Sequence, residues 1–233
     1  MKFLFRILVV CIFAGAALNS AGAAENNYQK AKQAYDDNEY ATAVKLLIPM
    51  AKAGNPKAQV LLGRIYDMPD GRPGVKKDRT KAQFWFEKAV KQDYTRGYRA
   101  LGFHLVGTGK NPKRGLRILK VAAERGDAQA QWGLGLYLSS SNWGLVENRA
   151  AARKWLLKSI EQKHVNAAFE LLKWYRGEGD YTEAHKWDLI VQYLWKSDST
   201  LLHPDIREKM TKTQIAESQH RAKAWLKAHG ENP

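Results

Sequence analysis

The chain has 233 residues, a formal net charge of +15 at pH 7 and a single cysteine, Cys11. One cysteine excludes an intramolecular disulfide and a cysteine-based zinc site, and a chain of this length can bury a core without such cross-links. The positive charge favours acidic partners.

The first residues have the pattern of a secretory signal peptide. Lys2 and Arg6 form a positively charged start, an apolar stretch runs from Ile7 to Leu18, and Ala21-Gly22-Ala23 supplies the small residues of a cleavage site. We therefore expect export to the periplasm, with cleavage after Ala23 or one residue later; secretion from the cell is the alternative. The apolar stretch is too short for a transmembrane helix, so no stable membrane insertion is expected.

A sequence pattern recurs along the chain after residue 40. The dipeptide Leu62-Gly63 returns as Leu101-Gly102 and Leu134-Gly135, and then as Leu171-Leu172, at spacings of 39, 33 and 37 residues. Within each repeat, large apolar residues recur three or four positions apart, as on one face of an α-helix. Pairs of amphipathic helices that repeat in this way must stack to bury their faces, so the pattern predicts an α-solenoid.

The spacing at which small and aromatic residues recur along the chain predicts how the helices pack. Glycine inside a helix costs up to about 1 kcal/mol relative to alanine, and close backbone packing would offset that cost at Gly63, Gly102 and Gly135. Another recurring position carries Trp85, Trp155 and Trp187, and we expect these three side chains to lie in the core.

The corner between the two helices of a repeat should adopt a left-handed backbone. Gly54 and Gly126 occupy this corner in two repeats, and glycine adopts that conformation without a steric penalty. Asp93 and Lys163 stand at the equivalent positions of the other two repeats, so their corners should differ slightly.

Both ends of the array are predicted to be closed by helices. A helical pattern over Asn27–Asp37 precedes the first repeat, and the segment Thr211–His229 forms a long helix after Pro204, with Thr211 or Thr213 as its cap. The predicted organisation is a signal peptide at 1–23, an N-terminal capping helix at 24–39, the repeats at 40–197, and a linker with a C-terminal capping helix at 198–233.

Positive charge is concentrated in one part of the chain. The segment from Arg72 to Arg125 holds fifteen Lys and Arg residues against four Asp and Glu residues, a net charge of +11. Arginine forms bidentate contacts with carboxylate and phosphate groups. The candidate partner-binding cations are Lys77, Arg79, Arg96, Arg99, Arg114 and Arg117. The alternative is a solvated basic surface that has no specific partner.

Trp143 is the candidate aromatic residue for binding. It lies in the predicted loop SSSNWGL, and a loop tryptophan can contribute strongly to an interface. The alternative interpretation is that its ring folds back onto the helices.

The sequence lacks the patterns that accompany catalysis. The six histidines show no i, i+4 zinc pair, and neither a G-x-S-x-G nor an S-x-x-K motif, a phosphate-binding loop or a calcium loop occurs. His104 and His185 are interpreted as packed side chains. We therefore expect no enzyme activity, no catalytic residue, no metal site and no cofactor.

The repeats resemble the Sel1-like family, a relative of the tetratricopeptide repeat. Four segments carry the resemblance in register: AQFWF at Ala82–Phe86, AAERG at Ala122–Gly126, AQAQWGLGLYL at Ala128–Leu138, and GVKKD at Gly74–Asp78. The likeness extends from about Tyr40 to Trp195 and implies an all-α fold, a right-handed α-solenoid. Some relatives with paired cysteines are linked to β-lactam binding, and this chain lacks those cysteines.

The resemblance implies a protein-binding scaffold in the periplasm. The partner would be an envelope or effector protein, and some Sel1-like proteins of this size neutralise toxic effectors by direct binding. A basic chain without an active site would suit an immunity protein for an acidic effector. The alternative is binding to the cell wall or to an anionic glycan, which leaves contact with anionic envelope components open. We expect no nucleic-acid partner, and the sequence leaves the oligomeric state open.

Overall fold

In the computed structural model, the residues described are 25–68, 73–196 and 203–231, and within these ranges the regular structure is entirely helical. A first helix over 25–36 is followed by eleven more. Their bounds are α2 (Tyr40–Lys52), α3 (Pro56–Asp67), α4 (Arg79–Lys91), α5 (Thr95–Gly107), α6 (Pro112–Glu124), α7 (Ala128–Leu138), α8 (Arg149–Glu161), α9 (Val165–Glu178), α10 (Tyr181–Trp195), α11 (Pro204–Glu208) and α12 (Lys212–Ala228).

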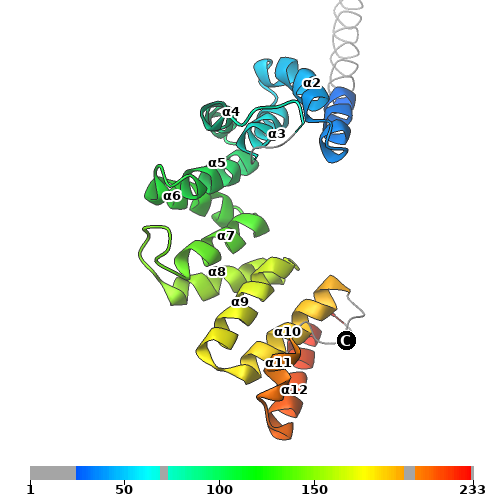
Figure 1. The fold of residues 1–233 in the computed structure, drawn as a ribbon, viewed down its shortest axis with the longest axis vertical. Helices are drawn as coiled ribbons and strands as arrows, with labels where there is room; N and C mark the ends of the chain where they lie inside the picture. The colour runs from blue at the N-terminus through cyan, green and yellow to red at the C-terminus, as the bar shows by residue number, and fades with distance from the viewer. Residues whose placement is uncertain (1–24, 69–72, 197–202, 232–233) are drawn as a thin grey trace, which may run out of the picture. The chain divides into compact units, whose positions relative to one another are not determined.

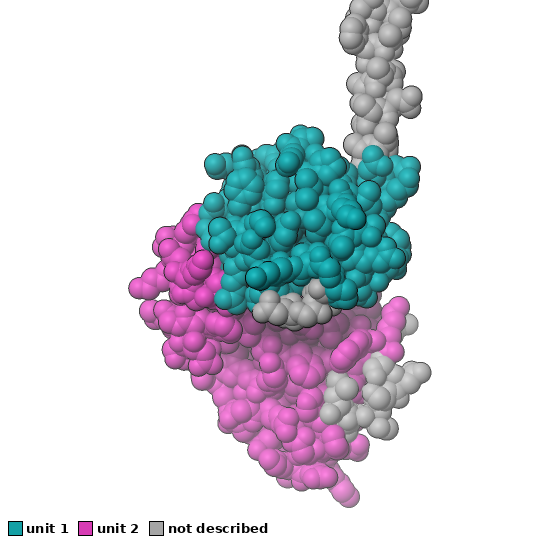
Figure 2. Space-filling view, turned by 45° about the horizontal axis from the view of Figure 1, so that its top comes forward, with its two compact units in different colours: residues 1–104 teal, residues 105–233 magenta. Residues whose placement is uncertain are grey.

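The helices form the predicted α-solenoid of helix pairs. Consecutive helices pack side by side: α2 with α3, α3 with α4, α6 with α7, α7 with α8, and α9 with α10 (Figure 1). The chain divides into two compact units, residues 1–104 and 105–233, which Figure 2 colours separately. The predicted signal peptide lies outside the described residues. The division of the chain into four segments, inferred from the sequence, remains a prediction.

Short polar side chains determine where most of the helices begin. The carboxylate or amide oxygen of an Asp or Asn accepts the backbone N–H three residues later, which satisfies a donor that the helix itself cannot pair. These caps are Asn55, Asp78, Asn111, Asp127, Asn148 and Asp180. The predicted cap of the last helix is confirmed, because Thr211 and Gln214 form a capping box at the start of α12.

Glycine permits the close packing that the repeat pattern predicts. A Cβ atom at Gly63 would lie 2.5 Å from the ring of Phe86, and one at Gly135 would lie 2.5 Å from Leu156 Cγ. Both contacts join the second helix of one repeat to the first helix of the next. A side chain at either glycine would therefore separate two helices that now touch.

The corner prediction is also confirmed. Gly54 and Gly126 have φ of +96° and +87°, while Asp93 and Lys163 adopt φ of +56° and +60° at the equivalent corners. A residue with a Cβ atom is strained in this conformation. The corner nevertheless keeps a left-handed backbone in all four repeats, whether its residue is glycine, aspartate or lysine.

One expectation about the core is only partly correct. Of the three tryptophans, Trp187 is 2% exposed, whereas Trp85 and Trp155 are only partly buried. The fully buried position in those repeats is the next residue, Phe86 or Leu156. The side chains of neighbouring residues in a helix point about 100° apart. A core position predicted one residue too early therefore recurs along the chain at the same spacing as the true core position.

Buried glutamines tie successive repeats together in each unit. Gln59 Nε2 donates to Ala51 O (3.0 Å), and Gln59 Oε1 accepts from Gln92 Nε2 (2.8 Å). In unit 2, Gln131 makes the same two contacts, with Ala123 O (3.1 Å) and Gln162 Nε2 (2.8 Å). The Ala-Gln pair in the first turn of α3 and of α7 therefore supplies both a small buried residue and the polar link to the next repeat.

Candidate functional site

A small groove in unit 1 is lined by positively charged side chains and tyrosine rings. It encloses about 50 Å³ between the first helix, α3 and α5. We call it the cation–tyrosine groove; its lining residues are Tyr28, Lys57, Val60, Leu61, Arg64, Tyr94, Arg96 and Arg99. Four of these residues are cations, and none of them is acidic.

Helical spacing on α3 explains half of the groove. Lys57, Val60, Leu61 and Arg64 are spaced i, i+3, i+4, i+7, which places them on one face of the helix. Val60 and Leu61 are 7% and 6% exposed and form an apolar floor, while Lys57 and Arg64 are exposed at its edge. An acidic residue that contacts this face would meet both apolar surface and positive charge.

Tyrosine rings hold two of the cations in place. Lys57 Nζ lies 5.7 Å from the centre of the Tyr28 ring and 3.1 Å from Glu25 Oε2, and the Arg64 guanidinium lies 5.5 Å from the centre of the Tyr35 ring. Lys57 is therefore held by both a ring and a carboxylate, whereas the guanidinium of the exposed Arg64 lies against a ring.

The charges of the groove also act on Tyr28. Burial raises the pKa of the Tyr28 hydroxyl, and the neighbouring Tyr94 adds to the rise, while Arg96 and Lys57 oppose it. The hydroxyl therefore remains protonated in the physiological range and can donate a hydrogen bond to an anion.

The structure distributes the predicted cations over several surfaces. Arg96 and Arg99 lie three residues apart on α5 and line the groove. Lys77 and Arg79 are placed before and at the start of α4, outside the groove lining. In unit 2, Arg114 is partly buried in the first turn of α6 and Arg117 is exposed on the next turn. Their role in binding remains a prediction.

Sequence reasoning missed Lys57, Arg64 and the two tyrosines of the groove. The basic segment from Arg72 to Arg125 begins after α3, so the cations of that helix lie outside it. The spacing of Lys57 and Arg64 around a Val-Leu pair was the signal that could have identified them.

The loop between α7 and α8 exposes apolar side chains. Trp143 is 39% exposed and Val146 is 82% exposed. The rings of Trp143 and Tyr137 form a T-shaped contact with their centres 5.3 Å apart, so the tryptophan side chain is held while part of its surface stays accessible. Burial raises the pKa of Tyr137 to about 12, so this supporting hydroxyl remains neutral.

A cluster of serine, histidine and aspartate lies in the C-terminal part of unit 2. Ser218 Oγ is 2.6 Å from His185 Nδ1, and Asp188 Oδ1 is 3.1 Å from His203 Nδ1. Ser218 and Asp188 are 0% exposed, so no substrate can reach them. The Ser218 hydroxyl donates to Ile215 O (2.7 Å), so its oxygen accepts from His185 instead of giving up its proton. This arrangement suits a structural link between α10, α11 and α12.

The predicted packing of His104 and His185 is confirmed. They are 2% and 1% exposed, and His104 Nδ1 lies 2.9 Å from Asp67 Oδ1. Over the described ranges, no group of three or more potential ligand residues could hold a metal ion. A search of the same residues finds no helix with the length and apolar character required to cross a membrane.

We expect acidification to destabilise the fold through His185. Burial lowers the pKa of its imidazole, with Arg207 adding to the effect and Asp188 opposing it. The unfolded chain then binds the proton more readily, so this contribution to stability is complete above about pH 6.5 and is lost as the pH falls through the folded pKa. Thermal melts between pH 7 and pH 5 should show a smaller loss for His185→Gln than for the original chain. The exposed His220→Gln should retain the original slope; equal slopes for all three proteins would contradict this role.

The comparisons with known proteins agree with the repeat pattern. A family model of the Sel1 repeat matches residues 56–94, 96–127 and 128–164. A search of curated proteins gives no match.

Solved structures share the fold at low sequence identity. The protein c5321, a protective antigen present in uropathogenic Escherichia coli strains and displaying an SLR fold, is 24% identical with a TM-score of 0.64; the match covers 80% of this chain and 41% of c5321. A Sel1 repeat protein from Oxalobacter formigenes is 22% identical with a TM-score of 0.60, over 89% of this chain and 87% of that one. The immunity protein Pa5087 from Pseudomonas aeruginosa is 17% identical with a TM-score of 0.54, over 88% and 83%.

The three matched segments follow one another directly and coincide with the helix pairs from α3 to the corner after α8. Because the family-model matches coincide with the repeat motif and with the helix pairs, residues 56–164 of this chain are Sel1 repeats.

Proposed function

We propose that this chain is an exported binding protein that holds an acidic protein partner through the cation–tyrosine groove of unit 1. The observation that carries the proposal is the convergence of Lys57, Arg64, Arg96 and Arg99 in one groove, where Glu25 forms an ion pair with Lys57. Such a group of cations raises the rate of encounter with an acidic surface and disfavours basic partners.

Within this class, the proposed role is that of an immunity protein in the periplasm. Three features support it: the fold shared with the immunity protein Pa5087, the signal-peptide pattern of residues 1–23, and the positive charge of the chain. Sel1 repeat proteins typically act as scaffolds without enzyme activity, which agrees with the buried position of the Ser218 cluster. The bound effector would lose its activity because its acidic surface is covered.

The test uses the exported proteins encoded beside this chain's gene. Each is purified, mixed with the chain and followed by gel filtration and calorimetry. We expect a complex with one acidic product that weakens at least tenfold as the salt concentration rises from about 0.05 M to about 0.5 M, because salt screens charges at the protein surface. Export of that product should arrest growth unless this chain is also present. A complex that is insensitive to salt would contradict the electrostatic basis, and the absence of a complex with all of these products would contradict the immunity role.

The alternative function is binding to the cell wall or to an anionic glycan, and the exposed face of Trp143 favours it. A partly exposed tryptophan ring can stack on a sugar. Sedimentation with purified peptidoglycan tests this function: retention that is lost in Trp143→Ala would support it over the protein partner.

A further inference from the structure

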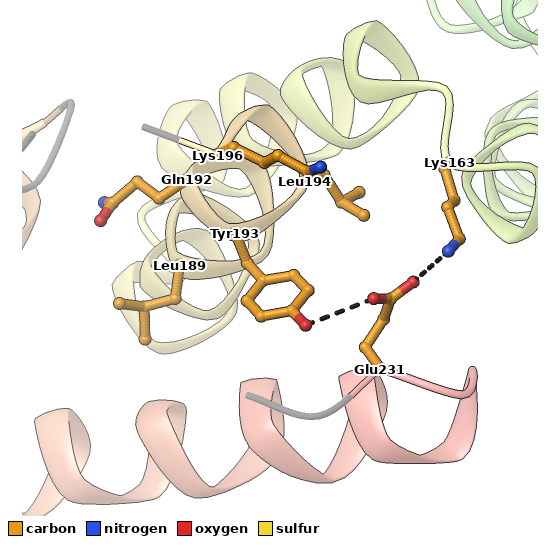
Figure 3. A pocket seen from close by; sticks show the side chains of 7 residues that line it. All are labelled: Lys163, Leu189, Gln192, Tyr193, Leu194, Lys196 and Glu231. Atoms are coloured by element: carbon orange, nitrogen blue, oxygen red, sulfur yellow. Dashed lines mark hydrogen bonds and ion pairs between the residues drawn. The ribbon is translucent and has the colours of Figure 1, made fainter. Parts of the chain in front are cut away.

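A second and larger pocket lies within unit 2. It encloses about 560 Å³ between the corner after α8, the end of α10 and the residues that follow α12 (Figure 3). We call it the C-terminal pocket; its lining residues are Lys163, Leu189, Gln192, Tyr193, Leu194, Lys196 and Glu231. This volume is in the range of pockets that hold small ligands or a few residues of a peptide.

Both lysines of the pocket stand on strained backbone. Lys163 has φ of +60° and Lys196 has φ of +51°, in the left-handed region that glycine adopts freely. The corner equivalent to Lys163 is glycine in two repeats, Gly54 and Gly126. Asp93 adopts the same conformation at the third equivalent corner, so the two lysine side chains, and not the backbone, distinguish this pocket.

The pocket already holds a carboxylate from its own chain. Glu231 forms an ion pair with Lys163, and its other oxygen accepts from the Tyr193 hydroxyl at 3.3 Å, as Figure 3 shows. Gly230, with φ of +77°, and the hydrogen bond from Glu231 N to Leu226 O (3.0 Å) position this side chain at the end of α12.

The charges around Glu231 agree with this geometry. The hydrogen bond from Lys163 lowers the pKa of the Glu231 carboxyl, and Lys196 acts in the same direction. The positive field of both lysines therefore reaches the same region of the pocket, where it favours a carboxylate over a neutral group.

We propose that the C-terminal pocket binds the free C-terminal carboxylate of an extended peptide whose last side chain is apolar. Its carboxylate contacts Lys196 and the exposed side of Lys163, and its last side chain packs on Leu194 and the Tyr193 ring. Backbone N–H groups of the peptide donate to Glu231. A simple fatty acid has no such donor and would bring a second negative charge against Glu231 without compensation.

This pocket is independent of the proposed function. It consists of unit 2 residues only, whereas the cation–tyrosine groove consists of unit 1 residues. Failure of peptide binding would leave the acidic-partner proposal unchanged, and failure of the acidic-partner assay would leave this one unchanged.

Isothermal titration of the purified protein tests the proposal with three probes: acetyl-Ala-Ala-Leu as the free acid, the same peptide as its C-terminal amide, and octanoate. We expect the acid to bind roughly tenfold or more tightly than the amide, since one charge-assisted contact changes affinity by about that factor. Octanoate should bind more weakly than the peptide acid.

Glycine substitutions separate ligand binding from folding. Lys163→Gly and Lys196→Gly each remove one ammonium group while relieving the left-handed backbone, so the helices should remain intact and binding of the acid should weaken roughly tenfold. Asp93→Gly is the matched control, because it relieves the same corner in unit 1 without touching the pocket. Its binding should equal that of the original chain.

Four outcomes would overturn the proposal. They are equal binding of the acid and the amide, tighter binding of octanoate than of the peptide acid, unchanged binding in both lysine variants, or no binding of the acid at about 10 mM, a concentration well above that of ordinary specific ligands.

Discussion

Gly135→Ala is expected to lower the Tm of this protein by roughly 2–8 °C, because the added Cβ atom has no space in the contact between α7 and α8. The new atom would lie 2.5 Å from both Cγ and Cδ2 of Leu156 and 3.2 Å from Ala152 O. Leu156 is 0% exposed, and its Cγ atom is the branch point of the side chain, so turning the end of the side chain alone does not relieve the contact. Overpacking of this kind costs about 1–3 kcal/mol, which outweighs the gain of up to about 1 kcal/mol in helix propensity.

Gly177→Ala is the matched control in the same unit. Gly177 lies in α9, and a Cβ atom there would meet no atom within 4 Å. Its substitution should leave the Tm unchanged or raise it slightly. Thermal melts followed by circular dichroism compare the two variants, and equal effects of the two substitutions would contradict the packing role of Gly135.

A double-mutant cycle with Leu156 identifies the contact directly. Leu156→Ala alone removes a buried side chain and should cost about 2–5 kcal/mol. In the double variant the alanine Cβ at position 135 occupies part of the vacated space, so the combined loss should be smaller than the sum by at least about 1 kcal/mol. Additive losses would show that the two residues do not share this contact.

Reversal of charge in the cation–tyrosine groove is expected to have the largest effect on binding. The variant Arg96→Glu with Arg99→Glu should weaken the complex with the acidic partner by about 100-fold or more, since each removed charge-assisted contact changes affinity by about tenfold and the new carboxylates repel the partner. Calorimetry at low salt measures this change.

The matched control changes the same net charge elsewhere in unit 1. Lys30→Glu with Lys91→Glu alters two exposed cations outside the groove lining and should reduce affinity only slightly, through the long-range field. Equal losses in both double variants would contradict the groove and leave only the net charge of the chain.

Two milder substitutions of Arg96 distinguish a loss of binding from a loss of folding. Arg99 is partly buried, so its reversal could disturb α5, whereas Arg96 is exposed. Arg96→Gln alone should weaken binding roughly tenfold while the melting curve stays unchanged. Arg96→Lys should fall between Arg96→Gln and the original chain, because lysine keeps the charge but loses the bidentate contact.

Much of the fold could be predicted because its determinants are local. The spacing of Leu62-Gly63 and its later copies identified the helix pairs, and the close approach at Gly63 and Gly135 followed from glycine's position within a helix. The left-handed corners at Asp93 and Lys163 were predictable from their alignment with Gly54 and Gly126.

The core position of each helix was harder to predict. Phe86 and Leu156 are fully buried where Trp85 and Trp155 were expected, because the helical period alone does not determine which of two adjacent apolar residues points toward the next helix. In α10 the position equivalent to Leu156 carries Asp188, whose buried carboxylate accepts from His203 and Gln192. That compensation depends on Gln192 in α10 and on His203 after it, and it has no repeat signal.

The sequence by itself determined the helical repeats, the small residues at their crossings, the corner conformations and the excess of positive charge, because each depends on residue type and on spacing along one or two helices. Only the tertiary structure decided which charges converge. Tyr28, Arg64 and Arg96 come from three helices, and Lys163, Lys196 and Glu231 from three separate segments. Their proximity follows from the angles at which packed helices cross, and those angles are determined by the complete set of side chains at each contact.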